Sequence, residues 1–250
     1  MNIFNLSFGK DSMATLLLAL EQGVKVDRVM YADIRFDSEI SGEHPIMAEW
    51  IPTAEKILRE KFGIVVDHAY SGVTYCEQFY REKTKGKHIG DKYGFPHTIG
   101  AWCNSSLKVK AIQKYMAQFK GQEITHFVGI AADEPKRWAR MQAKETGRVK
   151  YCSLLVEKNL TEQDAVAICK QHNLLSPIYG VDGIFRGGGV GFVQSNAKQT
   201  CTTFGETTPT CTASCWLWNP TATIHLSLTQ VLRKSRKNSR AAMCRSEKRQ

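Results

Sequence analysis

The stretch "NIFNLSFGKDSMATLLLAL", residues 2–20, predicts a strand, a tight loop and a helix in immediate succession. Residues 3–6 are typical of a short buried strand, and residues 13–21 place apolar side chains at helical spacing. The loop between them, residues 7–12, directs free backbone N–H groups and the positive end of the helix at whatever lies in front of it. This junction therefore predicts both an α/β fold and a place where an anion could bind.

The loop sequence SFGKDS has the residue types of an anion-binding turn. Gly9 allows close approach to the backbone, Ser7 and Ser12 add hydroxyl donors, and Lys10 adds a positive charge. The loop is not a Walker A motif, because the first glycine and the six-residue span are missing. An ordinary capped turn, in which Ser7 or Asp11 begins the helix, explains the same residues equally well.

Strands and helices alternate along the rest of the chain. Strands are expected at 25–34, 64–70 and 151–156, and the stretch 124–134 is expected to be a strand that runs into a loop. Helices are expected at 45–63, 105–119 and 161–173, and a loop excursion at 73–100. This order favours a doubly wound parallel sheet, in which ligands bind at the carboxyl ends of the strands. Four loops are then expected on one rim, at residues 7–12, 33–43, 95–108 and 131–140.

Composition narrows the class of protein. The chain has 250 residues, of which 42% are hydrophobic and 23% charged, as in globular proteins. Its net charge is +10, but residues 233–249 contain eight Lys and Arg against one Glu, so the remainder is only mildly basic. A run of about 18 apolar residues and a signal-peptide pattern are both missing, so we expect a cytoplasmic protein with reduced cysteines and no membrane partner.

Four motifs in order resemble one known family. SFGKDS after the first strand is similar to the S-G-G-x-D-S pyrophosphate loop of the PP-loop ATP pyrophosphatases. Asp33 closing the second strand, WCNSSLK at 102–108 and GIAADEPKR at 129–137 are the other matches. Through them residues 1–180 resemble a phosphoadenosine phosphosulfate (PAPS) reductase family protein, with the adenine nucleotide alpha hydrolase-like fold. The resemblance implies a nucleotide-binding enzyme.

The resemblance implies roles for particular residues. The phosphates of ATP or PAPS would be held by Ser7, Phe8, Gly9, Lys10, Asp11 and Ser12. The family usually has Gly where this chain has Phe8, so we expect that side chain to point away from the phosphates and to pack under the helix. The candidate catalytic residues are Lys10, Asp11 and Cys103.

Five rim residues complete the candidate site. Asp33 is placed to accept hydrogen bonds from a ribose or base, although a capping role is as plausible. Lys108 and Arg137 could neutralise phosphate or sulfate oxygens, and a lone Lys is more commonly a solvated charge. Asp133 and Glu134 could hold Mg²⁺, although paired acids in a loop are more often solvated.

The reaction is not decided by these motifs. PP-loop relatives form an adenylate and release pyrophosphate, whereas the reductases cleave a sulfonyl group with a cysteine thiolate, which needs an exposed cysteine of low pKa. The reductase Glu-Cys-Gly-Leu-His stretch is absent, which favours another substrate. The alternatives are an ATP pyrophosphatase component of nucleic-acid thiolation or DNA sulfur modification, with nucleic acid as partner, and a non-catalytic nucleotide-binding module.

The segment from residue 181 onward has a different character. After Gly189, Thr, Cys, Trp and Pro crowd together without a helical or strand period, which predicts an irregular tail. Reading its codons one base out of frame permits R-G-G-C-W-F-C-P, and one extra G in the codons for Gly187 to Gly189 would give the printed sequence. We therefore interpret 181–250 as an out-of-frame tail. A C-x-x-C pair there, with Cys103 and Cys152, could form an iron–sulfur site in relatives, but the printed chain lacks that pair.

Overall fold

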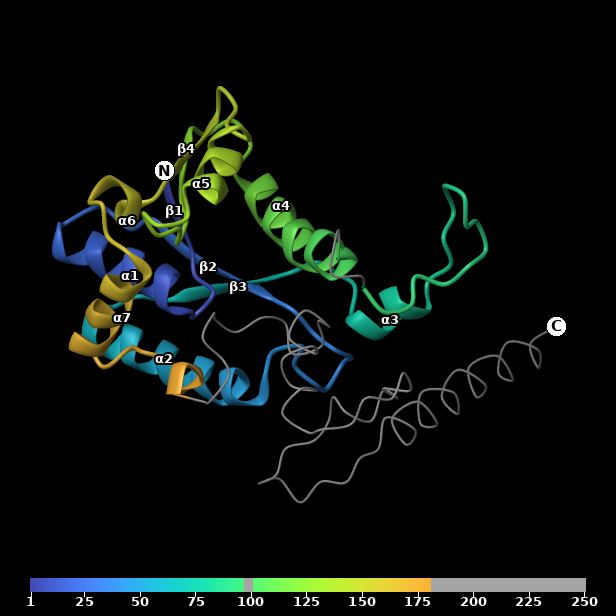
Figure 1. The fold of residues 1–250 in the computed structure, drawn as a ribbon, viewed down its shortest axis with the longest axis horizontal. Coiled ribbons are helices and arrows are strands. Elements are labelled where there is room, and N and C mark those ends of the chain that lie inside the picture. Colours follow the sequence, from blue (N-terminus) through green and yellow to red (C-terminus); the bar gives the residue numbers. More distant parts are fainter. Residues whose placement is uncertain (97–100, 181–250) are drawn as a thin grey trace, which may run out of the picture. The chain divides into compact units, whose positions relative to one another are not determined.

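The computed structural model describes residues 1–96 and 101–180, and these contain a parallel β-sheet covered by helices (Figure 1). Within this part of the chain five strands pair in the order β3-β2-β1-β4-β5. The strands are β1 (Asn2–Asn5), β2 (Arg28–Asp33), β3 (Val66–Tyr70), β4 (Ile124–Phe127) and β5 (Val149–Cys152). Every pairing between neighbours is parallel. The predicted doubly wound α/β fold is confirmed.

The helices lie between the strands in sequence. They are α1 (Lys10–Glu21), α2 (Pro45–Phe62), α3 (Tyr75–Tyr80), the π-helical η1 (Cys103–Val109), α4 (Lys110–Met116), the 3₁₀ turn η2 (Ala117–Phe119), α5 (Pro135–Gln142), α6 (Leu154–Glu157), α7 (Glu162–Gln171) and the 3₁₀ turn η3 (Pro177–Gly180). Helix α2 has Pro45 at its start and ends at Gly63, whose φ of 67° is the left-handed conformation that glycine adopts without strain.

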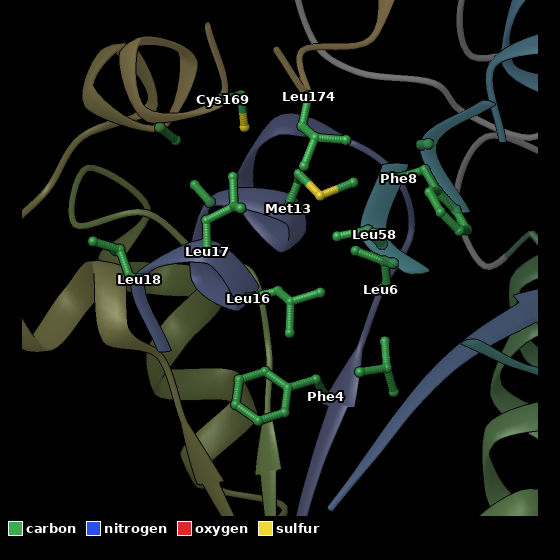
Figure 2. Close-up of a cluster of buried hydrophobic side chains, with 14 of the residues drawn as sticks. Phe4, Leu6, Phe8, Met13, Leu16, Leu17, Leu18, Leu58, Cys169 and Leu174 are labelled. Carbon is green, nitrogen blue, oxygen red and sulfur yellow. The ribbon is translucent and has the colours of Figure 1, made fainter. Parts of the chain in front are cut away.

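Helices cover both faces of the sheet because alternate strand residues point to opposite sides. On one face Phe4 of β1 and Leu6 just after it pack with Leu16 of α1 and Leu58 of α2 (Figure 2). Helix α7 lies outside α1 and adds Cys169 to the same cluster. Helix α1 is therefore buried at every residue from Ser12 to Ala19, as expected for a helix between a sheet and another helix.

The second face has a smaller core. Ile3, Met30 and Ala69 from three adjacent strands pack against Ala111 and Tyr115 of α4. The strand order changes direction between β1 and β4: β2 and β3 extend the sheet on one side of β1, and β4 and β5 extend it on the other. In open parallel sheets this change of direction leaves a crevice at the carboxyl ends of the two strands, where ligands commonly bind.

Three local predictions are wrong. The apolar run 151–156 is not one strand: β5 ends at Cys152, and Leu154 and Leu155 belong to the short helix α6. The excursion 73–100 contains α3, which begins with a capping box formed by Thr74 and Glu77. The rim loop predicted at 131–140 also includes most of α5. Short apolar runs fit a strand or a helix equally well, which explains the first error.

The structure says little about two further predictions, the out-of-frame tail and the absence of a membrane partner. The tail at 181–250, with its reading-frame interpretation, lies outside the described residues. Among the described helices, none combines the length and the apolar character needed to cross a membrane.

One buried side chain of the sheet links stability to pH. His126 of β4 is 3% exposed, its Nε2 has no hydrogen-bond partner in the described part of the chain, and its ring packs against Tyr151. Burial lowers the pKa of His126 from 6.5 to about 4. A buried ring that resists protonation makes folding progressively less favourable once the unfolded chain takes up the proton.

We therefore predict that the free energy of unfolding decreases by up to about 3 kcal/mol as pH falls from 6.5 to 4. Above pH 6.5 His126 is neutral in both the folded and the unfolded chain, so it causes no loss. Urea denaturation at several pH values measures the loss. His126→Leu should flatten that part of the profile, whereas Phe127→Leu, a change in the same strand without a titrating group, should leave it intact. An unchanged slope in His126→Leu would contradict the prediction.

Candidate functional site

The loop from β1 to α1 is held open by an unusual backbone conformation at Phe8. Its φ is 56°, in the left-handed region where residues other than glycine are uncommon. The ring has no exposed surface and meets Tyr31 edge to face within the core. Figure 2 shows Phe8 among the buried side chains of this cluster. The expectation that this ring packs into the core is confirmed, so a bulky residue is compatible with an open loop.

Hydroxyl groups fix the shape of the loop. Ser12 Oγ accepts a hydrogen bond from the backbone N–H of Ser7 at 3.0 Å and donates to the carbonyl of Gly9 at 3.0 Å. The two serine hydroxyls also lie 3.0 Å apart, at hydrogen-bond distance. Ser12 is buried and Ser7 is exposed, so the network joins the first turn of the helix to the open side of the loop.

The N-terminus of α1 keeps donors available. Its N-cap residue, Gly9, has no side chain to cap the helix, and the N–H of Met13 is the first to reach a helical carbonyl, that of Gly9. The N–H of Lys10 donates to the hydroxyl of Tyr179, on η3, at 2.9 Å. The N–H groups of Asp11 and Ser12 have no acceptor among the described residues. An anion could therefore accept hydrogen bonds from the N–H groups of Asp11 and Ser12, whereas the N–H of Lys10 is already bonded to Tyr179.

The side chain of Lys10 pairs with two carboxylates of the protein, whereas the sequence suggests that it faces a phosphate. Its Nζ lies 2.9 Å from Asp11 Oδ2 and 3.0 Å from Glu162 Oε2 of α7, and the residue is buried. Burial alone lowers the pKa of Lys10, but the bonds to the two carboxylates outweigh it and raise the pKa. A phosphate contact by Lys10 Nζ stays a prediction, and it would require the ammonium to leave both carboxylates.

The carboxylate of Asp11 belongs to the same buried group. Burial raises its pKa, and the negative charges of Glu162 and Glu134 act in the same direction, whereas the bond to Lys10 opposes them. The catalytic role predicted for Asp11 stays a prediction. Geometrically, Asp11 and Lys10 join the start of α1 to α7.

Asp33 lies at the end of β2, on the predicted rim, and is already bound. Arg35 Nε and Nη2 each lie 2.8 Å from its Oδ2, and the Arg35 guanidinium lies over the ring of Tyr70. This leaves Oδ1 of Asp33 as the acceptor that a ribose or base could use. Ribose or base binding by Asp33 stays a prediction.

A second group links Lys108 to residues that the sequence did not single out. Burial lowers the pKa of Lys108, the positive charge of Arg137 lowers it further, and the carboxylate of Glu43 opposes both. Glu43 accepts a hydrogen bond from the hydroxyl of Tyr31 at 3.0 Å. The charge of Arg137 of α5 therefore reaches Lys108 of η1, so two cations from separate elements lie on this rim.

The paired acids after β4 have structural contacts. Asp133 Oδ1 accepts the N–H of Glu162 at 3.3 Å, at the start of α7, and Glu134 pairs with Arg137 at 2.6 Å. Across residues 1–96 and 101–180 we find no group of three or more His, Cys, Asp or Glu side chains that could hold a metal ion. Magnesium binding by Asp133 and Glu134 stays a prediction.

Cys103 begins the π-helical segment η1 and is 2% exposed. Burial raises its pKa, although hydrogen bonds from nearby backbone N–H groups act against that shift. Cys152 at the end of β5 also has a pKa raised by burial and by its contact with Glu157, to about 12. A thiol in this setting is mainly protonated near neutral pH, which does not suit nucleophilic attack. The catalytic role of Cys103 stays a prediction.

The loop after β4 touches the start of α1 through Gly129. A Cβ at this position would lie 2.3 Å from the backbone nitrogen of Ser12 and 2.5 Å from the carbonyl carbon of Asp11. Only glycine permits this approach of two backbones. The GIAADEPKR segment is therefore packed directly against the SFGKDS loop, as two segments at a ligand-binding crevice would be.

The sequence did not single out Glu162, Tyr179, Glu43 or Tyr31. Glu162 follows Thr161 in the first turn of a helix, where an acid is ordinarily explained by the helix dipole. Tyr179 and Glu43 lie in segments without periodic patterning. Only the fold shows that Tyr179 bonds to the N–H of Lys10 and that Glu43 bonds to Tyr31. The signal that could reveal such contacts is co-variation of the two positions among related sequences.

Comparisons of the sequence with protein-family models and curated proteins, and of the fold with solved structures, found no match. The fold is that of an α/β protein with a doubly wound parallel sheet, and the N-terminus of α1 lies at its first strand–helix junction. The family resemblance of the motifs therefore remains a hypothesis.

The packing at Gly129 can be tested directly. Gly129→Ala places a Cβ against backbone that can yield only if the first turn of α1 moves, so we predict that the free energy of unfolding falls by about 2 kcal/mol. Urea denaturation measures this loss. Gly147→Ala is the matched control, because nothing lies within 4 Å of a Cβ there, and its change should stay below about 0.5 kcal/mol. Equal losses in the two variants would contradict the close approach.

Proposed function

We propose that this chain binds an adenine nucleotide, with the phosphates against residues 7–12. We propose further that it is a PAPS reductase-like enzyme whose reaction is that of an ATP pyrophosphatase. The observation that supports the proposal most is the position of α1. Its N-terminus, with the Asp11 and Ser12 N–H groups unbonded within the described residues, lies at the carboxyl end of β1 where the sheet changes direction. Helix N-termini at such points commonly bind phosphate.

The phosphates would be bound chiefly by backbone donors. The Lys10 side chain is already neutralised by Asp11 and Glu162, so the positive field in the loop comes from the N–H groups and the helix dipole. A phosphate oxygen at the first turn of α1 would compete with the Tyr179 hydroxyl for the N–H of Lys10. An ionised acceptor makes the stronger hydrogen bond, which favours the phosphate.

Lys108 and Arg137 would serve the leaving or transferred group. They come from separate elements on the same rim, and the positive charge of Arg137 lowers the pKa of Lys108. Two cations near a developing negative charge stabilise the transition state of phosphoryl or nucleotidyl transfer. The two basic side chains thus support cleavage of the nucleotide phosphate chain, with ATP or PAPS as substrate and Mg²⁺ as a candidate cofactor.

The state of Cys103 favours nucleotidyl chemistry over sulfonucleotide reduction. A reductase mechanism needs an accessible thiolate, whereas Cys103 is buried and its pKa is raised. Release of pyrophosphate needs no thiolate. We therefore place ATP pyrophosphatase chemistry first, and a non-catalytic nucleotide-binding module second.

Isothermal titration with ATP, PAPS and AMP, each with Mg²⁺, tests the proposal. ATP and PAPS should bind at least about tenfold more tightly than AMP, because a single phosphate can use fewer of the loop donors. Ser12→Ala should weaken ATP binding about tenfold, because its hydroxyl holds Ser7 against Gly9.

Thr15→Ala is the matched control, since it removes a buried hydroxyl one turn later on the same helix. It should change ATP affinity less than about twofold, and thermal unfolding confirms that both variants are folded. Equal affinity for ATP and AMP, or equal effects of the two substitutions, would exclude phosphate binding by the loop. Pyrophosphate release then separates enzyme from binding module: ATP binding without any release supports the module.

A further inference from the structure

A basic hairpin extends from the sheet edge beyond α3, and we call residues 81–94 the basic arm (Figure 1). Its two sides are held by backbone hydrogen bonds between Lys83 and Asp91, between Gly90 and Lys83, and between Tyr93 and Arg81. Gly86 and Gly90, both with φ near 90°, form its turns. The arm is therefore a defined structure and not merely a run of charges.

Positive charge dominates the arm. Five of its side chains are cationic and two are acidic; the cations are Arg81, Lys83, Lys85, Lys87 and Lys92. Nearly all of its residues are exposed, and none of the five cations has an ion pair with an acid in the described part of the chain. Exposed cations without ion pairs, gathered along one hairpin, are typical of a surface that binds a chain of phosphates.

Aromatic rings lie at the base of the arm. Tyr80 and Phe95 are 38% and 42% exposed, and both pack edge to face on Phe79 with ring centroids 4.9 Å apart. Lys92 lies 5.5 Å from the centre of the Tyr80 ring. Exposed rings held in place beside cations are the arrangement on which unpaired bases stack.

We infer that the basic arm binds single-stranded nucleic acid, with phosphates along its lysines and bases against Tyr80 and Phe95. Cations alone would suit any polyanion, but the fixed aromatic rings favour unpaired bases over a duplex or a lipid surface. This binding does not require the proposed nucleotide site. If both exist, nucleic acid would be the class of the second substrate, because the arm comes after β3 and residues 7–12 come after β1, both beyond the carboxyl ends of parallel strands.

Fluorescence anisotropy with a labelled single-stranded oligonucleotide, without ATP, tests the inference on the full chain. Lys83→Gln/Lys85→Gln/Lys87→Gln should weaken binding about tenfold at about 50 mM salt and reduce the slope of log affinity against log salt by about 2. The matched control removes three exposed lysines elsewhere, as Lys56→Gln/Lys61→Gln/Lys170→Gln. Because both variants keep the same basic residues at 233–249, any difference between them comes from the arm.

Further measurements fix the partner. Phe95→Ser should weaken single-stranded binding several-fold and leave binding to a duplex of the same sequence nearly unchanged. Equal losses in the two lysine variants would overturn the inference, as would an arm-dependent loss seen only with phosphatidylserine vesicles. ATP titration of the arm variant keeps the two proposals separate, since nucleotide affinity should not change.

Discussion

The turn at Phe8 is the constraint on which the site depends. A left-handed conformation at a residue other than glycine costs about 1–2 kcal/mol, and burying a phenylalanine ring contributes about 1.5–3 kcal/mol in return. The ring thus fixes the direction in which the chain leaves β1. Because α1 starts two residues later, its N-terminus is held beyond the carboxyl end of β1, where the strand order changes direction. The contact at Gly129 then brings the loop after β4 against the same turn.

The Lys10 ammonium and the backbone N–H groups of the loop have different partners. The ammonium of Lys10 joins α1 to α7 through Asp11 and Glu162, so it stabilises packing. The N–H groups of Asp11 and Ser12 have no acceptor among the described residues, whereas Arg137 already pairs with Glu134 and Lys108 is influenced by Glu43. Any positive field at the open side of the loop then comes from its N–H groups and the helix dipole.

Sequence patterns predicted the fold well and the site only in part. Alternating apolar strands and amphipathic helices lead to a parallel sheet, and SFGKDS leads to its first loop, because both are local properties of the chain. The inward turn of Lys10 could not be predicted, since it depends on Glu162, far along the sequence. The same holds for Tyr179 on the Lys10 amide. Helix α3 could have been found, because Thr74 and Glu77 have capping-box spacing.

The central claim is that the backbone amides at the start of α1 receive the phosphates of a nucleotide. Titration of isotope-labelled protein with ATP, followed by amide NMR, tests it most directly. The account predicts saturable shifts centred on the amides of residues 9–12, including that of Lys10 as its bond to Tyr179 is replaced. Amides of 9–12 that stay unmoved while ATP binds elsewhere, or fails to bind, would contradict it.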